Sequence, residues 1–201
     1  MSEFERWESR FAVPEYVFGK APNAFLKSKA HLFKRGQKAL AFADGEGRNG
    51  VFLAEQGLDV LSLDFSPNAI AKAKALARER GVSLRIEQAD IFTWDWPPAA
   101  FDVVVGIFFQ FASPDQRTKL FADIKKALKP GGLLLIEGYR PEQVDLKTGG
   151  PPQRENMYTR KILTEAFGDF AELDIKEYDS VVDEGSGHKG LSALIDLVGR
   201  K

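Results

Sequence analysis

The sequence contains no cysteine in its 201 residues, and it has no surplus of basic residues. The absence of cysteine excludes disulfides, thiolate metal sites and cysteine nucleophiles. Lys and Arg number 28 against 29 Asp and Glu, which gives a formal net charge of −1. A protein that binds nucleic acid through its phosphates needs an excess of Lys and Arg. We therefore expect no nucleic-acid partner.

Long apolar runs and a secretory signal are also missing. No apolar stretch approaches the roughly 18 residues that a membrane helix needs. The start, MSEFERWESR, lacks the basic beginning and the apolar run of a signal peptide. These absences predict a cytoplasmic protein with no membrane partner.

The sequence does contain short apolar runs that alternate with helical patterns. We predict strands at residues 38–43, 59–64, 82–90, 101–109 and 132–139. Helix starts are marked between them by Ser-Pro pairs at 66–67 and 113–114. Strands that alternate with helices predict right-handed βαβ units and a mostly parallel sheet.

The two ends of the chain depart from this alternation. Residues 1–35 carry two aromatic helical segments, the second bounded by Phe25 and Phe33 with Pro22 in its first turn. Residues 170–182 and 189–199 alternate in polarity around DEGSGH, which predicts an antiparallel hairpin.

These patterns predict one domain over residues 1–201. Its expected fold is a three-layer, Rossmann-like α/β sandwich. The seven-stranded sheet is mostly parallel and carries a C-terminal antiparallel hairpin. Residues 1–35 form an N-terminal helical part, and residues 36–201 form the Rossmann-like core. The length and the hydrophobic content of 44% suit a single domain.

A glycine-rich turn follows the first predicted strand. The run Gly45-Glu46-Gly47-Arg48-Asn49-Gly50 matches the pattern G-x-G-x-x-G and opens a helix. Its glycines allow a tight turn and the close approach of a ligand, while the helix start offers free N–H groups. The alternative is a glycine-rich turn without a ligand.

Two acids follow the next two predicted strands. Asp64 can accept hydrogen bonds from both hydroxyls of a ribose, or it merely precedes the helix cap at Ser66. Asp90 can accept a hydrogen bond from an adenine amine, with Ile91 and Phe92 beside the ring. Its alternative is a strand-end turn, a position that Asp favours.

Two further runs, FDVVVGIFFQF at 101–111 and LKPGGLLLIEG at 128–138, complete a family pattern. With the glycine turn and the two acids, they resemble the class I, Rossmann-like methyltransferases that use S-adenosylmethionine. The resemblance covers residues 36–140. It looks closest to the small tellurite-resistance and thiopurine-type enzymes, through YVFGKAPNAFL at 16–26 and the segment GYRPEQ…KTGGPP at 138–152.

The resemblance implies S-adenosylmethionine as cofactor and assigns its parts. The glycine turn holds the methionine portion, the acid after the second strand holds the ribose, and the acid after the third strand meets the adenine. The strand that begins near Phe101 passes under the reacting methyl, and the N-terminal aromatic residues form a lid. The expected cofactor-binding residues are Ala43, Asp44, Gly45, Gly47, Asn49, Asp64, Phe65, Asp90, Ile91 and Ile107.

The glycine turn departs from the family pattern at two positions. Ala41 stands where the family usually has an acid, and Ala43 stands where it usually has the first glycine. Ala43 fits such a turn if its φ is negative. Asp44 lies nearby and can replace part of the lost polar function.

The resemblance predicts methyl transfer to a small molecule, and the sequence shows no catalytic dyad. A soft nucleophile, such as a thiol or a metalloid oxyanion, needs no strong general base. The expected substrate residues are Tyr16, Gln110, Tyr139 and His188, and no metal site is expected. Catalytic residues are not assigned.

Two alternatives stay open at this point. The pattern G-x-G-x-x-G and Asp64 also suit an NAD-dependent oxidoreductase, although no substrate domain is recognisable in the sequence. The altered turn also suits a non-catalytic S-adenosylmethionine-binding protein, because a fold does not fix a function. We expect a monomer or a weak homodimer.

Overall fold

Seven strands and seven α-helices make up most of residues 2–201, the part of the chain that this computed structural model describes. The strands are β1 (Lys38–Phe42), β2 (Asp59–Asp64), β3 (Arg85–Gln88), β4 (Phe101–Ile107), β5 (Leu128–Tyr139), β6 (Glu172–Glu184) and β7 (His188–Arg200). The α-helices are α1 (Glu3–Phe11), α2 (Ala24–Ser28), α3 (Arg48–Glu55), α4 (Pro67–Glu79), α5 (Pro114–Ala127), α6 (Gln143–Leu146) and α7 (Arg160–Phe167).

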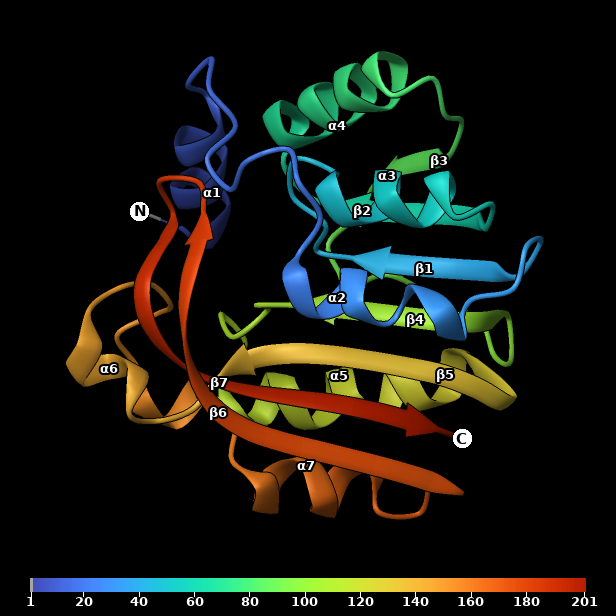
Figure 1. The fold of residues 1–201 in the computed structure, drawn as a ribbon, viewed down its shortest axis with the longest axis vertical. Coiled ribbons are helices and arrows are strands. Elements are labelled where there is room, and N and C mark those ends of the chain that lie inside the picture. Colours follow the sequence, from blue (N-terminus) through green and yellow to red (C-terminus); the bar gives the residue numbers. More distant parts are fainter. Residues whose placement is uncertain (1) are drawn as a thin grey trace. The chain divides into compact units, whose positions relative to one another are not determined.

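The strand order confirms the predicted fold class. The seven-stranded sheet has the order β3-β2-β1-β4-β5-β7-β6. The pairs β1–β2, β2–β3 and β4–β5 are parallel, and β7 runs antiparallel to β5 (Figure 1). The fold is therefore α/β, with a mostly parallel sheet and a C-terminal antiparallel hairpin.

The chain divides into two compact units. Unit 1 contains the residues up to Trp94 together with the hairpin tip, Glu184–Gly187. Unit 2 contains Asp95–Asp183 and His188–Lys201. The expected single domain with a boundary at residue 35 stays a prediction.

Unit 1 is built from β1, β2 and β3 with their connecting helices. Leu40 of β1 pairs with Leu61 of β2, and both are buried. Helix α3 packs on β1 and β2, and α4 packs on β2, β3 and α3. Ser66 caps α4 by accepting a hydrogen bond from the Ala69 N–H, as the Ser-Pro pair predicts.

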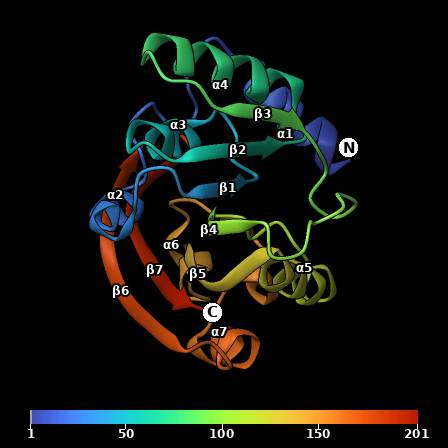
Figure 2. The same cartoon turned by 90° about the vertical axis from the view of Figure 1, so that its right-hand side faces the viewer.

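Unit 2 is built from β4, β5 and β7. Val104 of β4 pairs with Leu134 of β5, and neither has any exposed surface. Helices α5 and α7 contact each other, α5 packs on β5, and α7 packs on β7 (Figure 2). Ser113 and Gln116 form the capping box of α5.

The second N-terminal helical segment is shorter than predicted. Instead of one helix from Phe25 to Phe33, α2 ends at Ser28 and a separate 3₁₀ turn follows at Ala30–Leu32. The side chain of Asn23 caps α2, so Pro22 lies outside it. The Ser28 hydroxyl donates to the Phe25 carbonyl at 2.7 Å, so it competes for the acceptor that would continue the helix.

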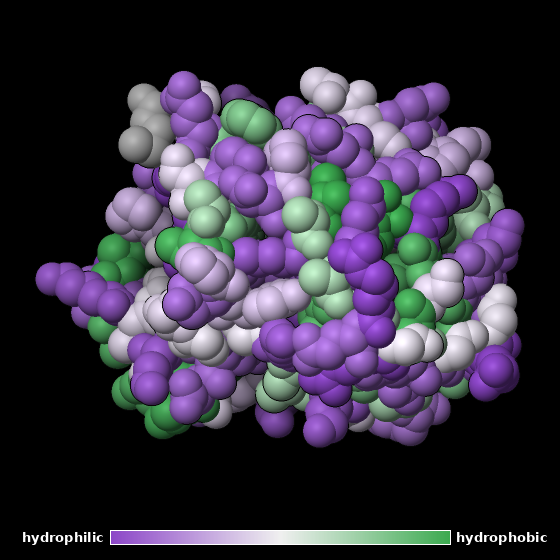
Figure 3. Space-filling model, turned by 90° about the horizontal axis from the view of Figure 1, so that it is seen from above, coloured by the Kyte–Doolittle hydropathy of each residue, from purple (hydrophilic) through white to green (hydrophobic). Residues whose placement is uncertain are grey.

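The surface carries few large apolar side chains. On the face seen in Figure 3, hydrophilic residues predominate and hydrophobic atoms form small separate groups. Among residues 2–201, no helix is long and apolar enough to cross a membrane. The same residues contain no cluster of three His, Cys, Asp or Glu side chains that could hold a metal ion.

Candidate cofactor and substrate sites

The glycine turn begins directly after β1 and has a left-handed backbone at three positions. The φ angles are +49° at Ala43, +57° at Gly45 and +85° at Gly47. The condition under which an alanine fits this turn, a negative φ at Ala43, is therefore not met. Its Cβ sits in a region that costs an L-residue about 1–2 kcal/mol, which explains why glycine suits this position better.

Close packing requires the two glycines that match the family pattern. A Cβ on Gly47 would lie 2.5 Å from the Cβ of Ala73 in α4. A Cβ on Gly45 would lie 3.5 Å from the ring of Phe11, in ordinary contact, but its φ disfavours any side chain. Gly47 thus lets α3 and α4 meet, and Gly45 shapes the turn beneath α1.

Asp64 at the end of β2 lies against the glycine turn. Its carboxylate accepts hydrogen bonds from the Gly45 N–H at 2.8 Å and from the Ser66 N–H at 2.9 Å. The residue is only 6% exposed. Burial raises the pKa of its carboxyl to about 6, and the backbone hydrogen bonds oppose that rise.

The side chain of Asp44 is engaged with β2 and the first turn of α3. Its carboxylate accepts from the Ser62 hydroxyl at 2.7 Å and from the Gly50 N–H at 3.1 Å. Burial raises the pKa of this carboxyl to about 7. A Cβ on Gly50 would lie 2.5 Å from the same carboxylate. Asp44 therefore holds the first turn of α3, where a negative charge is favourable.

Asp90 forms a turn and also keeps an exposed acceptor. Its Oδ1 accepts from the Phe92 N–H at 2.9 Å, which is the strand-end turn of the simpler interpretation. The residue is exposed, and Ile91 beside it is buried. Phe65, the residue after Asp64, packs edge-on against Phe4 of α1 at 5.7 Å between ring centroids.

The polar side chains inside the glycine motif hold other parts of unit 1. Asn49 is an expected cofactor-binding residue. Its side-chain oxygen accepts a hydrogen bond from the Asn23 N–H at 3.0 Å, which is a contact within the protein. Arg48 forms a buried ion pair of 2.6 Å with Glu184 at the hairpin tip. The sequence does not reveal these contacts, because their partners lie far along the chain.

Tyr16, an expected substrate residue, is engaged within unit 1. Its hydroxyl donates to the Lys72 carbonyl of α4 at 2.9 Å. Lys20 and Lys72 lie over its ring at 4.9 and 5.7 Å from the centroid. Burial raises the pKa of this phenol above its ordinary value.

Two expected substrate residues come together in unit 2. Phe108 stacks on Tyr139 with ring centroids 4.5 Å apart, and His188 meets Phe108 edge-on at 4.5 Å. Phe108 follows Ile107, the last residue of β4, and has a φ of +55°, which is unusual for an aromatic residue. We call Phe108, Tyr139 and His188 the aromatic cluster. Strained backbone of this kind concentrates at functional sites.

Gln110 supports the aromatic cluster through the backbone. Its amide donates to the Tyr139 carbonyl and accepts from the Tyr139 N–H, both at 2.6 Å. Both functional ends of the Gln110 amide are therefore engaged with β5. The geometry favours a role in positioning Tyr139 over direct contact with a substrate.

A loop that sequence reasoning did not assign covers Tyr139. A Cβ on Gly149 would lie 2.7 Å from the Tyr139 hydroxyl, and a Cβ on Gly150 would lie 2.9 Å from its ring. Gln143 fixes this loop by donating to the Thr148 hydroxyl at 2.9 Å. Both glycines have positive φ angles, which other residues rarely adopt. The Gly-Gly pair is therefore the feature of the sequence that could have indicated this loop.

The sequence matches a known family over part of its length. Residues 39–132 match the methyltransferase domain family. The chain is 32% identical over 112 residues to a demethylmenaquinone methyltransferase from Thermus thermophilus, covering 55% of this chain and 50% of that protein. It is 26% identical over 157 residues to thiocyanate methyltransferase 1 of Arabidopsis thaliana, covering 77% and 67%. The chain spans about half the length of the first curated relatives that it matches.

A solved structure shares the fold. An S-adenosylmethionine-dependent methyltransferase from Methanosarcina mazei superposes with a TM-score of 0.69 at 18% identity, covering 90% of this chain and 98% of the other. At this identity the likeness concerns the fold alone. The nearness to the tellurite-resistance and thiopurine-type subgroup stays a prediction.

The family match covers the glycine turn, both strand-end acids and the strand that leads to the aromatic cluster. S-adenosylmethionine is the cofactor of this family. Residues 39–132 therefore form a methyltransferase domain, and the fold around them is that of the class I, Rossmann-like S-adenosylmethionine-dependent methyltransferases.

Proposed function

We propose that this chain transfers a methyl group from S-adenosylmethionine to a small molecule whose acceptor atom is a soft nucleophile. A thiol or a metalloid oxyanion has the required chemistry. The observation that carries the proposal is the 2.8 Å hydrogen bond from the Gly45 N–H to the Asp64 carboxylate. It joins the glycine turn to the ribose-binding acid within residues that match a methyltransferase domain.

The residues of unit 1 fit the cofactor. A carboxylate has about four acceptor positions. Asp64 already accepts from the Gly45 and Ser66 N–H groups, and the Phe65 N–H also favours its charged form. The acceptor capacity that is left suits a ribose hydroxyl, and the backbone of Gly45 and Gly47 suits the methionine portion. Asp90 offers an exposed oxygen for the adenine amine. When bound, the cofactor supplies a methyl group on a sulfonium, which is electrophilic.

The protein would contribute orientation and exclusion of water. The aromatic cluster of unit 2 offers an apolar wall at the carboxyl ends of β4 and β5, where ligands bind in open α/β sheets. A thiolate or an oxyanion already carries its reacting electron pair and needs no strong base. The names of the thiocyanate and demethylmenaquinone relatives support a small acceptor. We also propose a cytoplasmic protein that acts without nucleic acid, as a monomer or weak homodimer.

Calorimetric titration with S-adenosylmethionine, S-adenosylhomocysteine and NADH tests the cofactor. We expect saturable binding of the first two ligands and none of NADH. Asp64→Ala should weaken S-adenosylmethionine by about 1–3 kcal/mol, since it removes charge-assisted hydrogen bonds. Glu79→Gln, on the exposed side of α4, is the matched control and should bind normally. Binding of NADH alone would overturn the assignment.

Transfer of labelled methyl groups to a panel of thiols and metalloid oxyanions tests the reaction. We expect turnover with at least one acceptor and loss of that turnover in Asp64→Ala. Saturable cofactor binding without turnover on any acceptor would favour the non-catalytic alternative, for which Ala41 and Ala43 give the sequence basis.

A further inference from the structure

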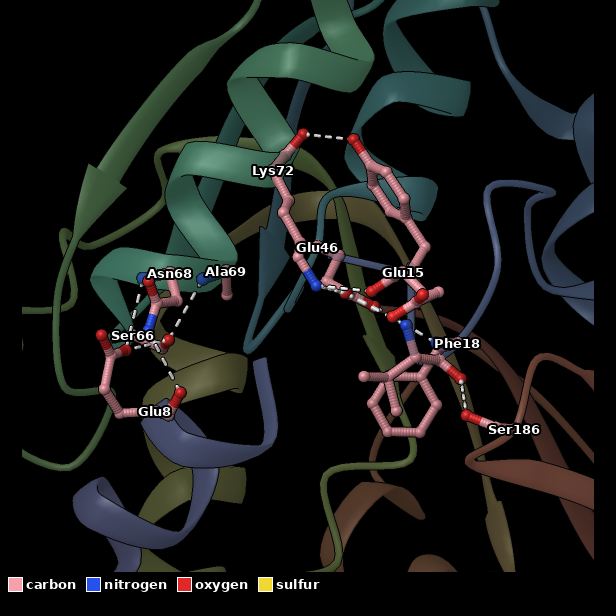
Figure 4. A network of polar contacts seen from close by, with 11 residues as sticks. Glu8, Glu15, Phe18, Glu46, Ser66, Asn68, Ala69, Lys72 and Ser186 are labelled. Atoms are coloured by element: carbon pink, nitrogen blue, oxygen red, sulfur yellow. Dashed lines mark hydrogen bonds and ion pairs between the residues drawn. The ribbon is translucent and has the colours of Figure 1, made fainter. Parts of the chain in front are cut away.

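Glu46, between the two glycines of the turn, points into a set of donors from the N-terminal segment. Its side chain is almost fully buried. The carboxylate accepts from the Val17 N–H at 3.1 Å and from the Phe18 N–H at 3.2 Å. It also accepts from the Lys72 ammonium of α4 at 2.8 Å (Figure 4). One side chain of the cofactor turn therefore holds the backbone of a segment almost 30 residues away.

The same segment is held on its other side by the hairpin tip. The carbonyl of Val17 accepts from the Gly187 N–H at 3.0 Å and from the Ser186 hydroxyl at 3.4 Å. A Cβ on Gly185 would lie 2.4 Å from that carbonyl oxygen, so the tip and the segment are in close contact. The two peptide groups of Val17 thus connect the glycine turn with the tip of the β6–β7 hairpin.

Helix α1 adds a second attachment over the same region. Glu8 accepts from the Ser66 hydroxyl and from the Asn68 N–H, so it is bound at the start of α4. The ring of Phe11 lies over Gly45. These contacts hold helix α1 against the glycine turn and the start of α4.

We propose that Glu46 is a positioning residue that latches residues Val17 and Phe18 to the cofactor turn, and that the cofactor exchanges only when this latch releases. Release also removes one attachment of the hairpin tip, because Val17 accepts from Ser186 and Gly187, while the Arg48–Glu184 ion pair remains. The control of cofactor exchange rests on the proposed function, whereas the contacts of Glu46 with Val17 and Phe18 do not.

Hydrogen exchange of the apo protein tests the latch alone. In Glu46→Gln we expect exchange of the Val17, Phe18 and Gly187 amides to accelerate by about tenfold or more, because a charged acceptor is lost. Amides of β5 report whether the fold is intact. Glu79→Gln is the matched control, because it breaks only the exposed ion pair between Lys20 and Glu79 of α4. It should leave the exchange rates of the Val17, Phe18 and Gly187 amides unchanged.

Lys72→Gln is a second variant that tests the latch if Glu46→Gln does not fold. It keeps the Glu46 carboxylate but removes its cation, so we expect faster exchange at Val17 and Phe18 than in the unmodified protein. Unchanged exchange of Val17 and Phe18 in both variants would overturn the latch. Acceleration at Val17 and Phe18 without any at Gly187 would overturn the connection to the hairpin tip.

Stopped-flow release of S-adenosylhomocysteine tests whether the latch controls cofactor exchange. We expect release from Glu46→Gln to be about tenfold faster, with the rate of methyl transfer at saturating cofactor changed far less. Saturating S-adenosylhomocysteine should also slow exchange at Val17 and Gly187 in the unmodified chain. Equal release rates in Glu46→Gln and the unmodified protein would overturn the control of cofactor exchange by the latch. Failure of any cofactor to bind would overturn the proposed function, while the exchange experiment would still decide the latch.

Discussion

At the scale of single residues, Asp64 combines its proposed ligand-binding role with the cost of burial. Its carboxyl must be ionised to accept from a ribose hydroxyl, and its pKa is raised to about 6. Cofactor affinity should therefore be nearly constant above pH 7. It should fall by up to about tenfold per pH unit as the pH drops below 6, where the carboxyl gains its proton. Calorimetric titration with S-adenosylmethionine between pH 5 and 8 measures this.

Asp64→Asn provides the control for that pH dependence. The amide cannot titrate, so the variant should bind weakly at every pH and show a flatter profile. A wild-type affinity that does not change between pH 7.5 and pH 5 would remove Asp64 from the ribose site.

Ala43 should be more stable as glycine. Its φ of +49° costs an alanine about 1–2 kcal/mol. Glycine lowers the free energy of unfolding by about 0.4–1 kcal/mol, because it has greater conformational freedom in the unfolded chain. Ala43→Gly should then raise the free energy of unfolding by about 1 kcal/mol in urea titrations. Ala39→Gly, at a buried position in β1, should lower it. A loss in both variants would contradict the left-handed conformation.

The sequence predicts only part of the site at this scale. Gly45, Gly47 and Asp64 follow strands at the spacing of a known pattern, so their placement could be foreseen. The engagement of Asn49 and Gln110 could not, because their partners lie 26 and 29 residues away. Such contacts depend on how distant segments pack, and no local pattern records them.

At the scale of elements, the crossing of α3 and α4 depends on the missing side chain of Gly47. Gly47→Ala would place its Cβ 2.5 Å from that of Ala73 and would also strain a φ of +85°. We expect a loss of about 2–4 kcal/mol in the free energy of unfolding, from overpacking and backbone strain together. Chemical denaturation of the single variants and the double variant measures it.

The double variant Gly47→Ala with Ala73→Gly separates these two causes. It should recover the part of the loss that comes from the clash with the Ala73 Cβ. It should leave the parts that come from the φ angle and from the Ala73 Cα, which would lie 2.8 Å from the new Cβ. Strictly additive losses would show that the two helices do not meet at this point.

Elements that begin with strong local signals could be predicted, and those that depend on tertiary contacts could not. The Ser-Pro pairs at 66–67 and 113–114 mark the starts of α4 and α5, as observed. The N-terminal segment was predicted as one helix from Phe25 to Phe33. It breaks after Ser28, whose hydroxyl takes up a backbone carbonyl of the same helix. Apolar spacing does not register such a competition.

At the scale of the whole molecule, burial of Asp44 makes global stability depend on pH. Its pKa is about 7 in the folded chain against an ordinary value of 3.8. The folded chain therefore binds more protons than the unfolded chain between these values, and its stability falls as the pH rises from about 4 to about 7. One such proton changes the free energy of unfolding by up to about 1.4 kcal/mol per pH unit.

Asp64 contributes a similar slope up to about pH 6, so a difference between two proteins isolates Asp44. In Asp44→Asn the side chain still offers an oxygen to the Gly50 N–H but has no charge to bury. The stability of this variant relative to the unmodified chain should rise from pH 4 to pH 7 and stay level above pH 7. Urea titrations at unit steps of pH measure the difference. A difference that is the same at every pH would mean that hydrogen bonds from Ser62 and Gly50 fully offset the burial of the charge.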